Sequence, residues 1–462
     1  MNSFRDSLTM MRHFLHRFSY RFAYRSIVST AFTVGMIGGV GACHGILDTT
    51  NPLLIRNEDI TNSTGAEGRR VALVQYWQIA MLRNVQASAL VSDEETYDNS
   101  SLQSYAYTPE WVLDTRDTTA IQKVNSDNDR NFRPLTQAFW TSSLAIYALR
   151  GYGDSHLKDD YLAESFALRG HLALLMAETI CAGFPMNDVD AGNRPIYGTA
   201  LTTDSALKYT VAQLDSALAH GKDSTQFINL ARVLKGRALL DLGQYATAAT
   251  AVQNVPDDFV YQPELVYQNP FYNEQAYGDQ SWFQFYMGDQ EGGNGLPYAS
   301  EQDSIRVPTL YGRQRTTASS IPLYRQNIYQ SETASIPIAT GREARLIRME
   351  AAYQANDPSW FDQLNTMRTE VGLDAIPAMP ATDTGKVNLI FHERAFWMYR
   401  TGHRLGDMRR LISRYGRDPE TVFPTGDYPI FGLKYGNATS IHFVTKLQMD
   451  YNPNITHGCT TP

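Results

Sequence analysis

Cysteine is scarce in this chain of 462 residues, which contains only Cys43, Cys181 and Cys459. None of them has the close spacing to another that a structural zinc site requires. A disulfide between Cys181 and Cys459 would close a very long loop and tie the C-terminus to the body of the protein. Two separate buried thiols are the alternative. The sequence leaves both open, because pairing depends on the distance between the two Cα atoms.

Basic residues are too few to balance the acidic ones. The chain has 40 Lys and Arg against 48 Asp and Glu, a net charge of −8. Residues 1–42 hold five arginines and one aspartate, so the remainder carries about −12. A body this acidic argues against nucleic acid, or an anionic membrane surface, as a partner.

Long apolar runs are absent after residue 42, so nothing there is expected to span a bilayer. Residues 1–25 contain five arginines, and residues 26–42 (SIVSTAFTVGMIGGVGA) contain no charge. A positive start, an apolar stretch and small residues at its end are typical of a secretory signal. A membrane-spanning helix is the alternative, but this stretch falls short of the roughly 20 apolar residues that a span needs.

The end of this segment, VGA followed by Cys43, resembles the lipobox of bacterial lipoproteins. The resemblance implies that the signal is cut just before Cys43 and that this cysteine is lipidated. A diacyl group on its sulfur would give two acyl chains, which is enough for stable anchoring. The alternative is an ordinary signal peptide that is cut elsewhere, with Cys43 a bystander.

Apolar residues at helical spacing predict an all-α protein whose helical core covers about 70–256 and 341–415. Small residues along one face of the segment YLAESFALRGHLALLMAETI, such as Ala163, Ala167 and Gly170, would let another helix approach closely. The segment 230–256 falls close to the tetratricopeptide pattern of helix, tight turn and helix. An ordinary helical hairpin fits that segment equally well.

Helical spacing is lost in 257–340, where Gly, Pro, Asn, Gln and aromatic residues dominate. A segment of this length is not expected to be one structureless loop, so short elements and a functional insertion are predicted. Helices return in 341–415, where VNLIFHERAFWMYRTGHRLGDMRRLI is predicted as one charged helix. The tail, 416–462, is rich in loop residues.

Several of these segments together resemble the SusD/RagB family of outer-membrane lipoproteins. They are, in chain order, LDTTNP shortly after Cys43, AESFALRGHLALLMAETICAGFP, the tetratricopeptide-like hairpin, REARLIRMEAAYQA, LNTMRTEVGL, ERAFWMYRTGHRLGDMRR and a terminal NPN. The match runs from about Leu47 to Asn454, and its most specific part is Glu393–Arg410. The chain departs from the family at Gly183–Pro185, which is shortened, and near the C-terminus.

The resemblance implies one domain over 43–462, after a signal peptide over 1–42. It implies a lipoprotein on the outer surface of the outer membrane that caps a TonB-dependent transporter, a SusC-like β-barrel. Such proteins capture an oligomeric nutrient, often a glycan, and pass it to the barrel without catalysis. No cofactor, metal or nucleic acid is expected. The alternatives are a secreted glycan-acting hydrolase on a helical scaffold and a protein–protein interaction scaffold.

Charged residues offer few catalytic candidates. Glu393 and His403 could form an acid/base pair, but on one helix they would be separated by about 15 Å of rise. A half-buried ladder of ion pairs is the favoured interpretation, with Asp407 paired to either Arg404 or Arg410. The acids at 93–95 could suggest hydrolysis or a cation site, yet a solvated loop is favoured. His457 and Cys459 are too few to hold a metal.

Aromatic residues are more informative, because the apolar faces of sugar rings stack on exposed Trp and Tyr. Two segments combine such rings with polar residues that suit sugar hydroxyls. The candidate ligand-binding residues there are Tyr105, Trp111, Trp282, Phe283 and Tyr286. The alternative is that these rings fill the core.

Overall fold

The computed structural model describes residues 60–97, 109–117, 131–190, 194–221, 224–265, 273, 276, 285–314, 322–428, 433–443 and 451–459. All of them belong to one compact unit, Asn57–Pro462. The predicted signal peptide and Cys43 lie outside the described residues. In the described part, no helix combines the length and the apolar character that a membrane span requires.

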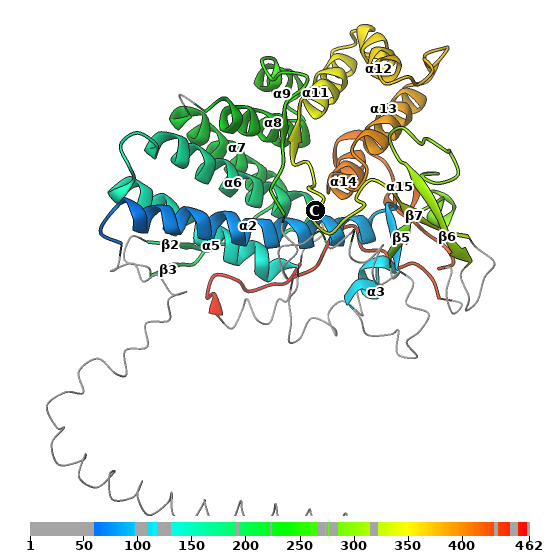
Figure 1. Ribbon diagram of the computed structural model, residues 1–462. Coiled ribbons are helices and arrows are strands. Elements are labelled where there is room, and N and C mark those ends of the chain that lie inside the picture. Colours follow the sequence, from blue (N-terminus) through cyan, green and yellow to red (C-terminus); the bar gives the residue numbers. More distant parts are fainter. Residues whose placement is uncertain are drawn as a thin grey trace, which may run out of the picture. The chain divides into compact units, whose positions relative to one another are not determined.

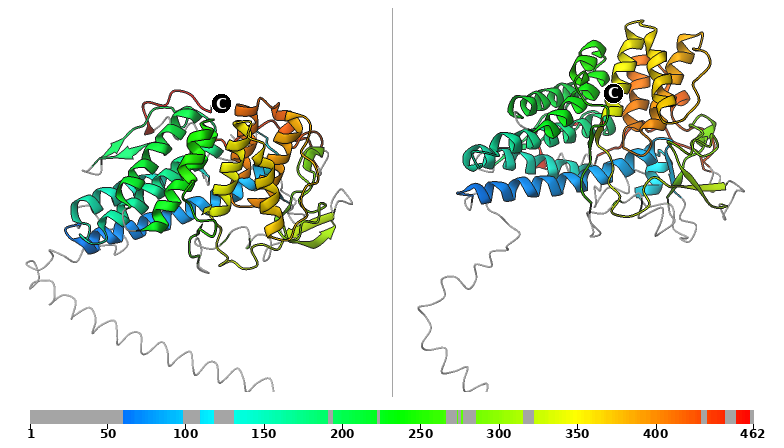
Figure 2. Two further views of the ribbon diagram at one scale, coloured as in Figure 1. Left: turned by 90° about the horizontal axis from the view of Figure 1, so that it is seen from above. Right: turned by 45° about the horizontal axis from the view of Figure 1, so that its top comes forward.

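Most of the described residues are helical, which confirms the predicted fold class. The helices are α2 (Ser63–Val91), α3 (Pro109–Asp114), α5 (Phe132–Tyr152), α6 (Lys158–Thr179), α7 (Thr203–His220), α8 (Thr225–Asp241), α9 (Tyr245–Val252), the 3-10 turn η4 (Glu291–Gly293), α11 (Gly341–Gln354), α12 (Ser359–Glu370), α13 (Asp383–Trp397), α14 (Arg404–Tyr415) and α15 (Pro419–Val422). Figure 2 shows α6 to α9 on one side, α11 to α14 on the other, and the long helix α2 running beneath both.

Short antiparallel pairs of strands join distant segments. They are β1 (Glu95–Tyr97) with β5 (Phe285–Met287), β2 (Asp188–Val189) with β3 (Pro195–Ile196), β4 (Val260–Tyr261) with β8 (Ala339–Thr340), and β6 (Thr309–Gln314) with β7 (Pro322–Gln326). The segment 257–340 therefore contains short elements, as predicted. Because β1 follows α2 directly, the β1–β5 pair attaches this insertion to the helical core (Figure 1).

Helix α2 begins where the side chain of Asn62 accepts a hydrogen bond from the Gly65 amide, which satisfies one of the free amides of the first turn. Its residues Leu73, Trp77 and Met81 recur every four positions and are buried. From Asn84 to Val91 every residue is buried, because other elements cover this end of the helix on all sides. The C-terminal end of α2 is thus part of the core.

The predicted close approach of helices is confirmed at Gly170, and a second close approach occurs at Gly236. A Cβ atom on Gly170 of α6 would lie 2.7 Å from the Leu214 side chain of α7. A Cβ atom on Gly236 of α8 would lie 2.4 Å from Val252 of α9. Gly243, with φ of +73°, makes the tight turn between α8 and α9. The segment 230–256 therefore forms the predicted helical hairpin.

The single helix predicted over residues 387–412 is wrong. The chain leaves helical geometry after Trp397 and resumes it at Arg404, so α13 and α14 are separate helices. Arg400 has φ of +55° and Gly402 has φ of +84°, both in the left-handed region that ends helices. A Cβ atom on Gly402 would lie 2.9 Å from Val85, so this turn packs closely against α2.

The C-terminal tail is fastened to the end of α6. Cys181 and Cys459 form a disulfide, with their Cα atoms 5.4 Å apart, which answers the question that the sequence left open. The Ile441 amide donates to the Thr179 carbonyl (2.7 Å), and the Asn454 side chain donates to the Tyr197 carbonyl (2.9 Å). The Cys459 sulfur is therefore not a free metal ligand.

Candidate functional site

The three acids at the end of α2, Asp93, Glu94 and Glu95, are fully buried, so their prediction as a solvated loop is wrong. The reason is that cationic and amide partners arrive from the α13–α14 turn and from the insertion. These partners lie about 200 to 300 residues away in the sequence and cannot be recognised from local composition. The acids position the insertion against the helices.

Asp93 joins three elements. Its carboxylate accepts two hydrogen bonds from Arg404 of α14, at 2.6 and 2.7 Å, and one from the Leu296 amide of the insertion, at 2.8 Å. Two parallel charge-assisted bonds fix the orientation of both side chains. Arg404 therefore pairs with Asp93. The sequence had left Arg404 and Arg410 open as partners of Asp407, and it is Arg410 that lies 3.0 Å from Asp407.

Glu94 and Glu95 hold the left-handed turn. The Glu94 side chain accepts from the Arg400 amide (2.8 Å), and its carbonyl oxygen accepts from the Tyr399 hydroxyl (3.0 Å). The Glu95 carboxylate pairs with the Arg400 guanidinium and accepts from the Gln86 amide group. Burial raises the pKa of Glu94 to about 8, despite the opposing effect of the Arg400 amide.

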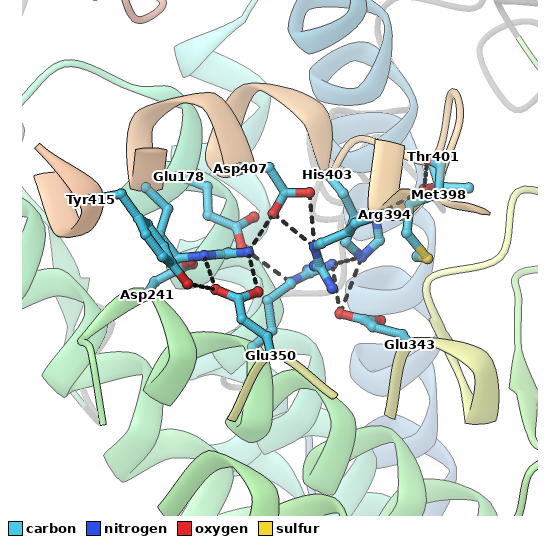
Figure 3. A network of polar contacts seen from close by, with 12 residues as sticks. Glu178, Asp241, Glu343, Glu350, Arg394, Met398, Thr401, His403, Asp407 and Tyr415 are labelled. Carbon is cyan, nitrogen blue, oxygen red and sulfur yellow. Dashed lines mark hydrogen bonds and ion pairs between the residues drawn. The ribbon is translucent and has the colours of Figure 1, made fainter. Parts of the chain in front are cut away.

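The charged face of α14 is buried between the two groups of helices, and it is not a half-buried ladder along one helix (Figure 3). Arg410 lies 2.8 Å from Asp241 of α8 and 3.0 Å from Glu350 of α11. Arg394 of α13 lies 2.8 Å from Asp407, and the Tyr415 hydroxyl donates to Glu350 (2.7 Å). These contacts connect helices, so their evident role is structural.

Glu393 and His403 do not form an acid/base pair. The Glu393 carboxylate lies 2.6 Å from Arg306 and 2.5 Å from Arg368. Burial alone would raise the pKa of Glu393, but His392 and these arginines lower it, so it is a poor proton donor. His403 instead lies 3.2 Å from Glu343, and burial beside Arg237 lowers its pKa.

A cavity of about 580 Å³ opens where the insertion meets α13, α14 and α15. The side chains that suit sugar hydroxyls in its wall are Asn294, Asn388, His392 and Arg417. The His392 ring stacks on Phe396 at 4.6 Å, and its Nε2 atom lies 2.8 Å from Glu301. Burial lowers the pKa of His392, but the bonds to Glu301 and Glu393 outweigh it and raise the pKa overall.

Two tyrosines of the β6–β7 hairpin belong to the same insertion as Asn294 and Leu296 of the cavity wall. Tyr311 and Tyr324 face each other across the strands, with ring centroids 5.9 Å apart, and Tyr311 is 59% exposed. Tyr324 packs against the buried cluster around Phe396, and so does Leu296 of the cavity wall. We call the cavity and these two rings the insertion site.

The sequence did not single out this hairpin. Its only signal was that Tyr, Arg and Gln occur together twice within the predicted insertion, as YGRQ at 311–314 and as YRQ at 324–326. Of the predicted stacking rings, Tyr286 is 1% exposed and packs in the core, so its assignment to a ligand is wrong. Tyr105, Trp282 and Phe283 lie outside the described residues. Trp111 lies in α3, and its side chain is outside the described part.

Among the described residues, no group of three or more His, Cys, Asp or Glu side chains is arranged to hold a metal ion.

No protein-family model matches the sequence, and no curated protein matches it. Solved structures do match. A SusD superfamily protein from Bacteroides vulgatus has a TM-score of 0.60 at 11% identity, over 86% of this chain and 98% of that one. A SusD-like carbohydrate-binding protein from the same species has a TM-score of 0.60 at 15% identity, over 86% and 97%. Surface glycan-binding protein A from Bacteroides uniformis has a TM-score of 0.59 at 11% identity, over 86% and 99%.

These matches cover nearly the whole length of the other proteins and most of this chain. The chain therefore has the SusD-like fold, which confirms at the level of the fold the resemblance found in its sequence.

Proposed function

We propose that this protein binds an extracellular glycan at the insertion site and delivers it to a TonB-dependent outer-membrane transporter, without chemical turnover. The observation that carries the proposal is the SusD-like fold, shared along most of the chain with a protein described as surface glycan-binding. The leader and Cys43 support export and a lipid anchor on the outer membrane.

The insertion site has the chemistry that a glycan requires. The exposed ring of Tyr311 suits the CH faces of sugar rings, and Asn388 and Arg417 offer polar groups for hydroxyls. Arg417 already donates to Asn388 (3.2 Å), so the two side chains are held together before a ligand arrives. A volume of about 580 Å³ lies within the range of small-ligand pockets.

A binding screen tests the first part of the proposal. The purified chain is titrated with a panel of oligosaccharides and polysaccharides, and each mixture is then analysed for released products. Binding without product is expected. Product release that depends on a carboxylate of this chain would instead support a hydrolase.

A pull-down from detergent-solubilised membranes, with the native protein as bait, tests the second part. Recovery of a large β-barrel transporter is expected, together with a diacylated Cys43 in the mass spectrum of the bait. A Cys43→Ser variant should fractionate away from the outer membrane. An unmodified Cys43 in the native protein would contradict the anchor, and failure to recover any barrel would contradict the delivery role.

A further inference from the structure

The wall of the cavity at the insertion site is basic, although the chain as a whole carries a net charge of −8. Among the described residues that line it, the titratable ones are His392, Arg404 and Arg417, and none is an Asp or a Glu. Two other cavities do have acids in their walls: one contains Asp362 and the other contains five carboxylates. A wall of this kind attracts an anionic ligand more strongly than a cationic one.

Two of the three basic side chains already meet a carboxylate of the protein. Arg404 is 5% exposed and donates two hydrogen bonds to Asp93. The Nε2 atom of His392 lies 2.8 Å from Glu301. Their charges are therefore balanced within the protein, and neither is the main attraction for an anion.

Arg417 differs from both, because its partners are neutral. Its Nη2 atom donates to the Thr384 carbonyl and to the side-chain oxygen of Asn388, at 3.2 Å each. Its Nε and Nη1 atoms donate to none of the residues that the structure describes, and within that part of the chain no carboxylate forms an ion pair with it. The guanidinium of Arg417 is thus held in place while its charge and several of its N–H groups stay available.

The acids near Arg417 in the fold are engaged elsewhere. Asp418 and Glu420 follow it in the sequence but line a different cavity, and the Asp418 carboxylate accepts from the Glu420 amide at the start of α15. Asp383, next to Thr384, lies 3.0 Å from Lys386. None of these carboxylates takes the place of a ligand on Arg417.

Asn388 adds a donor beside this cation. Its side-chain oxygen accepts from Arg417, so its amide group points its N–H bonds elsewhere and is left to donate to a ligand. Asn388 is exposed, and the half-buried side chains of Leu296 and Leu389 in the same wall offer apolar surface. A sugar ring that carries an acidic group combines the two features that such a wall recognises.

We propose that the glycan bound at the insertion site carries a carboxylate, as a uronic acid does, and that Arg417 and the Asn388 amide group bind this carboxylate. The inference rests on the proposed function, since it names the class of glycan for the same site. A planar carboxylate matches a guanidinium in shape. Its single charge also balances the single charge of Arg417, whereas a doubly charged phosphate would stay unbalanced.

Isothermal titration of the purified chain with acidic oligosaccharides tests this. The probes are oligogalacturonate, oligoalginate and sialyllactose, each beside its methyl ester, together with neutral malto- and xylo-oligosaccharides and a sulfated carrageenan oligosaccharide. At least one acidic oligosaccharide should bind, and its methyl ester should bind about tenfold more weakly. Binding of neutral glycans alone, or equal binding of the carrageenan, would overturn this inference but leave the proposed function standing. Failure of every glycan would contradict the proposed function itself.

Variants at Arg417 locate the contact. Arg417→Gln should weaken binding of the acidic oligosaccharide about tenfold, whereas Arg417→Lys, which keeps the charge, should retain part of the affinity. The matched control is Arg194→Gln, which removes the same charge from a side chain that is 82% exposed and outside the cavity wall. It should leave binding unchanged. Equal losses in Arg417→Gln and Arg194→Gln would show that only net charge matters, and equal losses in Arg417→Gln and Arg417→Lys would show that the charge has no role. Either result would refute the assignment.

Discussion

Arg404 and Asp93 lie 311 positions apart in the sequence, yet their side chains form two parallel hydrogen bonds of 2.6 and 2.7 Å in the core. Asp93→Asn leaves the arginine buried without a counter-charge, so the free energy of unfolding should fall by about 3–5 kcal/mol. Urea denaturation followed by circular dichroism measures this. As a control, Asp190→Asn breaks an exposed pair with Arg194 and should change stability by less than about 0.5 kcal/mol. Equal effects of the two variants would show that the buried pair has no special role.

Glu94 should make stability depend on pH. Its pKa is about 8 in the folded protein, above the ordinary value of 4.5, so the folded state holds a proton that the unfolded state loses. Stability contributed by this group is therefore greatest at low pH, falls as pH rises from about 4.5 to 8, and then levels off. Glu94→Gln should flatten this part of the profile, because glutamine stays neutral and can still accept from the Arg400 amide. Unfolding free energies measured from pH 5 to 9 test this, with Glu67→Gln as the surface control.

The disulfide should stabilise the folded protein by restricting the unfolded chain. Cys459→Ser should lower the free energy of unfolding by about 2–4 kcal/mol. It should also make the segment 451–459 more sensitive to proteases, since this tail would then be held only by the burial of Ile455 and by hydrogen bonds such as that from Asn454 to Tyr197. Reduction of the unmodified protein should reproduce the effect. If a reductant lowers the free energy of unfolding of Cys459→Ser as much as that of the unmodified protein, the disulfide is not the source of the stability.

Gly236 tests the helical hairpin. Gly236→Val should destabilise the protein by about 1–3 kcal/mol, because even a Cβ atom would lie 2.4 Å from Val252 of α9. The matched control is Gly151→Ala in α5, where an added Cβ atom has nothing within 4 Å. That substitution should stabilise the helix by up to about 1 kcal/mol. Thermal unfolding of both variants decides whether close packing or helix propensity governs these glycines.

Tyr311 tests the insertion site. Tyr311→Ala should weaken binding of the glycan found by screening about tenfold, which corresponds to about 1.4 kcal/mol of lost stacking. Stability should be unchanged, since the ring is 59% exposed. Tyr451→Ala, which removes a ring that is 70% exposed on the C-terminal tail, should bind normally. Equal losses in both variants would show that Tyr311 has no specific role.

Helices with a clear apolar repeat could be predicted, because that repeat is a local property of the sequence. Gly170 and the small residues near it marked close helix packing correctly for the same reason. The break between α13 and α14 could not be predicted, because it depends on Val85 and the acids of α2, which meet the turn only in the folded protein. Tertiary packing likewise decides that Tyr311 is exposed and Tyr286 is buried. Both are tyrosines of the insertion, so residue type alone could not tell them apart.

The acids that end α2 also limit how the molecule can be divided. A fragment that stops before Arg400 would have to bury Asp93, Glu94 and Glu95 without the cations and amides that compensate them. Its longest helix would then be followed by three carboxyl groups without the partners that hold them in the full chain. Truncation before Arg400 is therefore expected to loosen the end of α2 together with the part of the insertion that packs on it.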